Sequence, residues 1–203
     1  MPRVVRVLAA AEAARLVEDG QTLAVGGSGN GHGVAESVLA ALEARFLEAG
    51  HPRDLTLFQV VGIGDWKTRC GVDRLAYPGM LRCAIGSNIG NSPILAQLAA
   101  EGAIEAYSLP QGVLAQLCRA MAGRQPGLVT HIGLHTFVDP RLGGGRLNEI
   151  SRQELVELVR LGGQELLFYL AVPPDVALIR ATTADEAGNL SFEEETAFLD
   201  ALP

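Results

Sequence analysis

The chain has 203 residues, of which 48% are hydrophobic, and a formal net charge of −7. This length and composition fit one folded domain, or one domain with a small appendage, and exclude a largely disordered chain. The acidic balance excludes a dominant basic surface, and no apolar run approaches the roughly 18 residues of a membrane-spanning helix, so we expect neither a nucleic-acid nor a membrane partner.

The three cysteines, Cys70, Cys83 and Cys118, are scattered and lack the C-x-x-C spacing of a zinc or redox site. An odd, unpatterned set favours free thiols over a disulfide framework. The apolar run over residues 7–11 is too short for a signal peptide and is interrupted by Glu12. We therefore expect a cytoplasmic protein.

The first predicted elements are a helix over residues 9–19, ended by Gly20, and a short apolar strand over residues 22–25. Five glycines then fall within residues 26–33, before a second helix over residues 35–49. Glycine loses the most conformational freedom on folding, so this density suits a sharp turn or a backbone lying against a ligand. A loop that opens a helix also offers N–H groups to phosphate, carboxylate or oxyanion charge.

This loop matches none of the common glycine motifs. The dinucleotide pattern G-x-G-x-x-G fails at every offset, and no lysine follows to make a phosphate-binding loop. The hydrolase pattern G-x-S-x-G fails because Asn30 occupies its last position, and Ser28 with the nearby His32 lacks an acidic partner. Nicotinamide and ATP chemistry are therefore not expected.

The unit of a strand and a glycine-bearing turn recurs with strands over residues 55–61, 81–85 and 104–108. Helices over residues 93–101 and 113–122 follow the last two turns. This alternation predicts a three-layer α/β/α domain with a largely parallel sheet. Because parallel strands end at one edge, we expect the four turns to line a binding cleft rather than only to connect elements.

The turn before the last of these helices reads Leu109-Pro110-Gln111-Gly112. Pro110 suits turn position i+1 and Gly112 suits i+3, which places Gln111 immediately before the helix. Its amide would donate a hydrogen bond beside the positive end of the helix and stabilise an oxyanion. A glutamine that only caps its helix is an equally good interpretation of the local pattern.

Beyond Thr130 the pattern changes. His131 and His135 are predicted on one face of an extended segment, as satisfied polar positions rather than metal ligands, so we expect no metal site. The remaining elements predicted are a flexible loop over residues 139–145, a β-hairpin near residues 155–170 that turns at Gly162-Gly163, strands over residues 176–182 and 190–192, and a helix from residue 193.

Several segments together resemble the α half of the family I coenzyme A transferases, most closely the branch that acts on propionate and acetate. They are DGQTLAVGG, LEAGHPRDLTLF, GIGD, IEAYSLPQGVLAQL, HTFVDPRLGGGRLNE and DVALIRATTADEAGNLSFEEE. They keep the family order and cover nearly the whole chain. The family's glycine loop normally has phenylalanine after the paired glycines and proline before the acidic residue. Here these positions are Ser28 and Ala35.

The resemblance implies an exchange of coenzyme A between an acyl-CoA and a short-chain carboxylate through a glutamyl-CoA thioester. Coenzyme A would be a substrate, and no permanently bound cofactor is expected. Gln111 falls where the family has its oxyanion glutamine, and the glycine loop would line the acyl site. With the other edge turns, the expected substrate-binding positions are Gly26, Gly27, Ser28, Gly29, Asn30, Gly31, Gly64, Asn88 and Gly112.

In the family the nucleophilic glutamate belongs to the second half, in a glutamate-x-glycine context that nothing here matches. The nearest string, Glu101-Gly102, closes a predicted helix. We therefore expect residues 1–203 to form a CoA-transferase α-domain-like unit, incomplete at its C-terminus and without the catalytic β domain. Its expected partner is a catalytic β half or β subunit, within an oligomer. A component of a CoA-ester hydrolase and a non-catalytic ligand-binding or regulatory domain are the alternatives.

Overall fold

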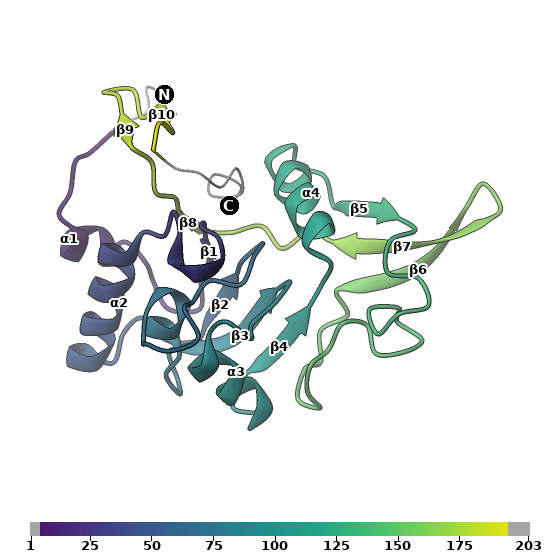
Figure 1. The fold of residues 1–203 in the computed structure, drawn as a ribbon. Helices are drawn as coiled ribbons and strands as arrows, with labels where there is room; N and C mark the ends of the chain where they lie inside the picture. Colours follow the sequence, from purple (N-terminus) through teal and green to yellow (C-terminus); the bar gives the residue numbers. More distant parts are fainter. Residues whose placement is uncertain (1–4, 195–203) are drawn as a thin grey trace.

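A computed structural model describes residues 5–194 and is built around a sheet of five parallel strands (Figure 1). The strand order is β4-β3-β2-β1-β8, and every neighbouring pair runs parallel. This confirms the largely parallel sheet. The strands are β1 (Thr22–Val25), β2 (Leu55–Phe58), β3 (Leu81–Gly86), β4 (Glu105–Ser108) and β8 (Val176–Leu178).

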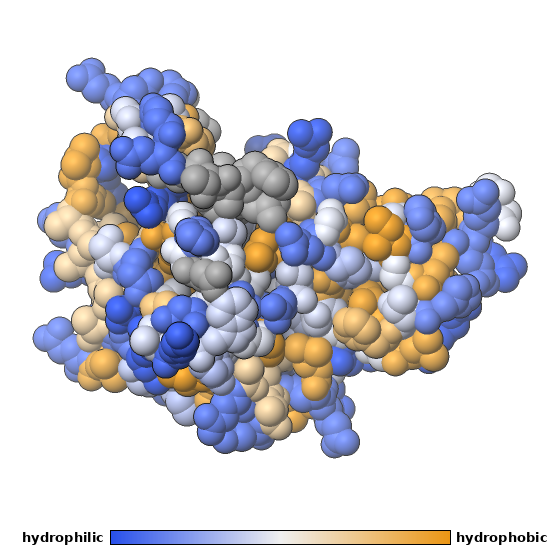
Figure 2. All heavy atoms as spheres, in the orientation of Figure 1, coloured by the Kyte–Doolittle hydropathy of each residue, from blue (hydrophilic) through white to orange (hydrophobic). Residues whose placement is uncertain are grey.

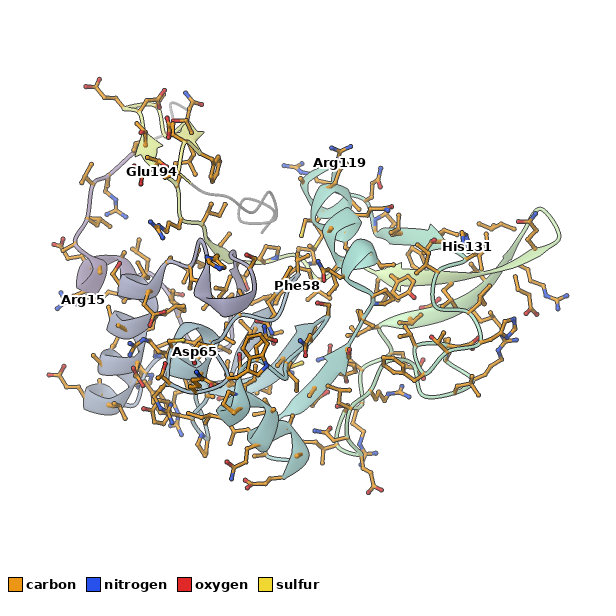
Figure 3. All side chains as sticks on the ribbon, in the orientation of Figure 1. Arg15, Phe58, Asp65, Arg119, His131 and Glu194 are labelled. Atoms are coloured by element: carbon orange, nitrogen blue, oxygen red, sulfur yellow. The ribbon has the colours of Figure 1, made fainter. Side chains whose placement is uncertain are left out.

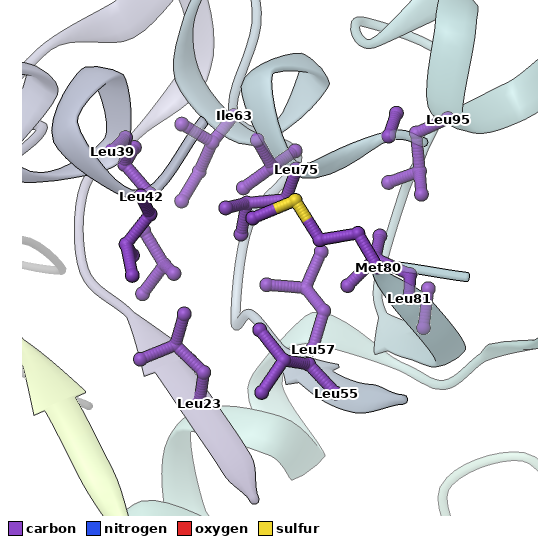
Figure 4. Packing of buried hydrophobic residues seen from close by; sticks show 14 of the residues in the cluster. Leu23, Leu39, Leu42, Leu55, Leu57, Ile63, Leu75, Met80, Leu81 and Leu95 are labelled. Atoms are coloured by element: carbon purple, nitrogen blue, oxygen red, sulfur yellow. The ribbon is translucent and has the colours of Figure 1, made fainter. Parts of the chain in front are cut away.

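One face of this sheet is covered by helices. A cluster of buried aliphatic side chains, including Leu23, Leu57, Leu39 and Leu95, fills the space between them and the sheet (Figure 4). Burial of both faces explains why the strands are nearly all apolar. The covering elements are α1 (Ala10–Ala14), α2 (Glu36–Ala49), the 3₁₀ helix η2 (Gly71–Leu75) and α3 (Pro93–Ala100).

The opposite face is covered by α4 (Gln111–Ala122) and a small antiparallel sheet, which completes the three layers. A second buried cluster joins Phe58 and Tyr107 of the parallel sheet to Leu114 of α4 and Tyr169 of the small sheet. Figure 3 shows Phe58 between the parallel sheet and α4. The small sheet has the order β5-β7-β6, with β5 (Gly127–Thr130), β6 (Val156–Leu161) and β7 (Gln164–Leu170).

The predicted hairpin is confirmed as β6 and β7, joined by Gly162 and Gly163 at φ +57° and +80°. Two consecutive positive φ values are what a tight hairpin turn requires, and glycine adopts them at no steric cost. The chain ends its described part with a two-stranded antiparallel pair, β9 (Thr183–Ala184) and β10 (Leu190–Ser191). Most of the helix expected from residue 193 lies outside the described residues.

Several predicted boundaries are wrong. The first helix stops at Ala14 because Arg45 of α2 donates hydrogen bonds of 2.7 Å to the carbonyl oxygens of Ala14 and Val17, so a residue far along the chain caps it. Strand β2 ends at Phe58 and β8 ends at Leu178, both earlier than expected. Helix α4 begins two residues earlier than expected, at Gln111.

The segment containing the two central histidines is also not extended. Residues 131–147 form a series of turns, and His135 has φ +62°. The apolar alternation there reflects separate contacts, such as Val138 packing into the second cluster, rather than a strand. Apolar side chains reach the surface over this segment and the small sheet (Figure 2), among them Val129, Ile132, Phe137, Leu158 and Leu161.

The exposed edge of β4 is covered by residues 145–151. Ser108 N donates to the Gly145 carbonyl at 2.8 Å, and Leu147 N donates to Ala106 O at 2.9 Å. The Ser151 hydroxyl accepts from Ala106 N at 2.9 Å and donates to Ala106 O at 3.0 Å. These bonds satisfy backbone groups that would otherwise invite pairing with another chain.

The loop predicted to be flexible, residues 139–145, is held by a buried carboxylate. Asp139 is fully buried and accepts hydrogen bonds from the backbone of His135 at 3.0 Å and from the Arg141 guanidinium at 2.7 and 2.9 Å. Arg141 also donates to Glu165 of the hairpin at 3.1 Å. The Arg141 bonds hold the pKa of Asp139 well below its usual value of 3.8.

This pairing predicts a specific pH dependence of stability. Because the pKa of Asp139 is lower in the folded state, its stabilisation is present above pH 3.8, the unfolded value, and is lost as the pH falls below it. We expect Asp139→Asn to lower the denaturation midpoint at pH 7. The difference in midpoint between this variant and the parent chain is expected to narrow below about pH 4. Urea titrations across pH measure this.

Glu154→Gln is the matched control, because that carboxyl side chain is 81% exposed. It is expected to change the free energy of unfolding by less than about 0.5 kcal/mol. If the difference in denaturation midpoint between Asp139→Asn and the parent chain stays constant down to pH 2, the ionised carboxylate does not stabilise the folded state as described.

Candidate active site

The carboxyl ends of β1, β2, β3 and β4 lie at one edge of the sheet because the four strands are parallel. The loop after β1 is folded back on itself: Ser28 N donates to His32 O at 2.9 Å around the 3₁₀ turn η1 (Gly29–Gly31). Gly27 has φ +134°, and a Cβ there would lie 2.7 Å from Val34. The glycine density therefore serves a tight, closed loop.

Asn91, which is 4% exposed, ties this loop to the next two. Its Nδ2 donates to Gly62 O at 3.0 Å, and its Oδ1 accepts from Asn88 Nδ2 at 2.7 Å. A Cβ at Gly29 would lie 3.5 Å from the same Nδ2. Asn91 therefore sits where the loops after β1, β2 and β3 meet.

The loops after β3 and β4 are joined in turn. Leu109 N donates to Gly86 O at 2.9 Å, and the Ser108 hydroxyl donates to Ser87 O at 3.0 Å. These bonds fix the chain just before Gln111. Gln111 is the first residue of α4, its side chain is exposed, and no side-chain hydrogen bond caps this helix in the described structure.

Gln111 lines a groove of about 510 Å³ between the edge turns and the segment of residues 132–138. One side carries polar groups and the other is mainly apolar. The lining residues are Ser87, Asn88, Ser108, Leu109, Pro110, Gln111, Ile132, Gly133, Thr136, Phe137 and Val138. None of these side chains is an acid, a base or a thiol, so the groove offers hydrogen-bond donors and apolar contact but no ionisable nucleophile.

The structure thus brings Asn88 and Gln111 into one groove, which the turn pattern predicts. Gly26, Gly27, Ser28, Gly29, Gly31, Gly64 and Gly112 lie at or next to the same edge but are not among the residues that line this groove. The side chain of Asn30 lies outside the described part. Asn91 was missed by sequence reasoning, although Gly62 and Gly64, which leave room for it, were a usable signal.

A family model described as coenzyme A transferase matches residues 7–202. The chain belongs to the coenzyme A transferase family. It is 43% identical over 204 residues to acetate CoA-transferase YdiF of Escherichia coli K12, covering 99% of this chain and 38% of that protein. It is also 43% identical to caffeate CoA-transferase of Acetobacterium woodii, covering 94% of this chain and 36% of the relative.

A relative of a different kind is the alpha subunit of a probable coenzyme A transferase of Bacillus subtilis 168. It is 29% identical over 187 residues, which cover 92% of this chain and 72% of the relative. Among solved structures, the acyl-CoA transferase YdiF of E. coli O157:H7, as a thioester complex with CoA, superposes with a TM-score of 0.94 at 42% identity. That match covers 98% of this chain and 40% of YdiF. The chain therefore spans about two fifths of the YdiF-type transferases.

In this CoA transferase chain, charged side chains form a hydrogen-bonded network at the start of α2, just after the glycine loop. Glu36 accepts hydrogen bonds from Arg74 Nε at 2.5 Å and from Gly71 N at 2.9 Å. Arg74 also donates to Glu43 at 2.6 Å, and Tyr77 donates to the same carboxylate at 2.8 Å. The loop after β2 is thereby fixed to α2.

Two classes of site find no support in residues 5–194. No group of three or more His, Cys, Asp or Glu side chains there could hold a metal ion. Within the same range, no helix combines the length and the apolar character needed to cross a bilayer.

The close packing of the loops around Asn91 predicts opposite effects on stability when Gly64 and Gly112 are replaced by alanine. A Cβ at Gly64 would collide with the Asn91 carbonyl and the Ser92 hydroxyl, whereas a Cβ at Gly112 meets nothing within 4 Å. We expect Gly64→Ala to cost about 1–3 kcal/mol of unfolding free energy, as overpacking does. Gly112→Ala, on the first turn of α4, is expected to be neutral or to stabilise by up to about 1 kcal/mol.

Urea denaturation of the two variants beside the parent chain measures both effects. Equal midpoints for the two variants would show that the loops after β2 and β3 are not packed as closely as described.

Proposed function

We propose that this chain supplies the acyl-binding and oxyanion-stabilising part of an acyl-CoA:carboxylate CoA-transferase. The observation that carries the proposal is the groove at the sheet edge. The side-chain amide of Gln111 lies in this groove beside an apolar wall that includes Ile132 and Phe137. Among the described residues, no side-chain hydrogen bond caps α4 at this point. The similarity to YdiF, solved as a thioester complex with CoA, supports the same conclusion.

The proposed chemistry needs a carboxylate nucleophile that the groove itself lacks. The glutamate of a second half or β chain is the nucleophile that attacks the thioester carbonyl, and the carbonyl oxygen becomes an oxyanion. Gln111 Nε2 donates a hydrogen bond to that oxyanion, aided by the positive end of α4. Expulsion of the CoA thiolate leaves an acyl-glutamyl anhydride. The thiolate then attacks the glutamyl carbonyl, which releases the carboxylate product and leaves the glutamyl-CoA thioester.

The second half of the exchange runs these steps backward with a different carboxylate. Coenzyme A enters and leaves as a substrate. The relatives act on acetate and on caffeate at the same 43% identity, so likeness alone does not select the acyl group. We propose short-chain acids such as acetate and propionate, in a cytoplasmic oligomer. The relative from Bacillus subtilis, itself named as an alpha subunit, supports a separate β chain or an equivalent half.

The first test concerns the missing nucleophile. We expect the 203-residue chain alone to give no exchange between acetyl-CoA and labelled propionate, and exchange to begin when a glutamate-bearing second half is added. Liquid chromatography of the CoA esters, with and without added carboxylate, measures the products. Turnover by the chain alone would refute this division of roles. Free CoA and acid formed without exchange would identify a hydrolase instead.

The second test concerns Gln111. In the assembled enzyme, Gln111→Ala is expected to lower kcat by about 10²-fold, the scale of losing one oxyanion donor. Gln116→Ala removes an exposed glutamine from the same helix and is the matched control, expected to leave kcat unchanged. Steady-state assays at saturating substrates measure both. If Gln111→Ala behaves like the control, Gln111 has no part in catalysis.

A further inference from the structure

Strand β6 leaves one edge of the small sheet open. The order β5-β7-β6 places this six-residue strand at the end of the sheet, and no strand within residues 5–194 pairs with its other side. The hairpin that it forms with β7 projects from the body of the molecule (Figure 1). The edge of β4, in contrast, is covered by residues 145–151. The other edge strands of the two larger sheets are shorter, with three residues in β8 and four in β5.

The register of the hairpin shows which backbone groups face this open edge. Leu155 O accepts from Leu170 N at 2.9 Å, and the pairing then continues to the turn without a bulge. Hydrogen-bonded pairs alternate along an antiparallel ladder, so Val156, Leu158 and Arg160 direct their N–H and C=O groups away from β7. The strand also contains no proline. It therefore lacks two of the features that keep an edge from pairing with another strand.

A groove of about 320 Å³ lies beside the start of the open edge. It is lined by Pro140, Gly144 and Arg146 from the preceding loop and by residues 154–158. The Nε of Arg146 is buried and has no hydrogen-bond partner among the described residues, and its Nη2 lies 3.9 Å from a carboxylate oxygen of Glu154. A buried N–H donor without an acceptor is costly, so we expect a partner to bring an oxygen atom into this groove.

The charges along the edge favour a second copy of this chain as the partner. An acidic peptide would meet Glu154 and Glu157, which line the groove beside Arg146. A second copy instead brings both signs of charge on the same strand. The four charges of the edge, which include Arg160, sum to zero, so the net charge of −7 is not concentrated there. Charges more than about 8 Å away are largely screened at physiological salt.

Two copies of β6 are complementary when they run antiparallel with Leu158 opposite the same residue of the other copy. Val156 then lies opposite Arg160 of the other copy, in register with the free N–H and C=O groups. Glu154 lies diagonally across from that arginine, within reach of a long side chain. Both side chains are available, since Glu154 is 81% exposed and Arg160 is 77% exposed although it bonds Glu165 at 2.9 Å. A two-fold axis repeats each contact.

We propose that this chain forms a two-fold dimer in which the β6 edges of two copies pair antiparallel and join their three-stranded sheets into one continuous sheet. Leu158 pairs with its own copy, and Val156 pairs with Arg160 on both sides of the axis. The hairpin end of each copy lies beside the groove of the other and brings backbone carbonyl oxygens to Arg146 Nε. The inference does not depend on the proposed function, because it uses no residue of the groove that contains Gln111.

Sedimentation equilibrium of the 203-residue chain tests the pairing. Concentrations from about 1 to about 200 μM suit an interface this small, for which micromolar affinity is expected. The mean mass should rise from 21.4 kDa towards twice that value. Hydrogen exchange of the amides of residues 156, 158 and 160 should slow as the concentration increases. A mass of 21.4 kDa throughout, or a dimer in which these three amides exchange as in the monomer, overturns the inference.

Leu158→Pro removes the N–H at the centre of the proposed pairing. An edge strand accepts proline where its N–H faces solvent, so the hairpin should remain folded, and the dissociation constant of the dimer should rise at least about 10-fold. Glu154→Arg needs no backbone change and places an arginine near Arg160 of the other copy, so it should weaken the dimer about fivefold.

Glu48→Arg is the matched control, because it makes the same change of charge at an exposed position of α2, on the other side of the molecule from the hairpin (Figure 1). It is expected to leave the dissociation constant unchanged. If Glu154→Arg behaves like this control, the proposed register is wrong. If the chain alone stays monomeric and the three amides are protected only when a second transferase half is added, that half covers the edge and the inference is refuted.

Discussion

The candidate site depends on one constraint: four parallel strands must end at the same edge, and their loops must then be held together without a continuing sheet. The buried amide of Asn91 does most of this, since it bonds Gly62 and Asn88 and lies against Gly29. Backbone polar groups in a buried loop need partners, and a side-chain amide supplies a donor and an acceptor at once. Gly62 is required by this amide, because a Cβ there would collide with the Asn91 Oδ1.

The meeting of these loops also leaves one buried side chain weakly hydrogen-bonded. Gln59 follows β2 and is 1% exposed, and its Nε2 makes only a long 3.4 Å hydrogen bond to Asn88 O. Its Oε1 is buried without a partner among the described residues. Gln59 is thus joined to the loop after β3 by one weak hydrogen bond, close to Asn88 of the groove.

Much of this arrangement was predictable from sequence, because it follows from local signals. Apolar strands with glycine turns predict the parallel sheet, and Gly162-Gly163 between alternating residues predicts the hairpin. The parts of the fold that the sequence did not predict depend on residues that are distant in the chain. Arg45 ends α1 by bonding Ala14 and Val17, and β5 exists only because it pairs with β7. The central role of Asn91 depends on the approach of the loop after β2, for which Gly62 and Gly64 give only an indirect local signal.

The composition of the groove is the physical basis of the proposed division of catalysis between this chain and a second half. A carboxylate nucleophile inside a groove with an apolar wall would lose solvation and gain a proton, unless an opposite charge stood beside it. The described lining provides no such charge. Gln111, in contrast, is neutral at every working pH, so it remains a donor without the cost of burying an ion. The described groove thus offers a neutral hydrogen-bond donor and no carboxylate. That composition is the physical reason why we propose that the attacking glutamate belongs to a second structural unit.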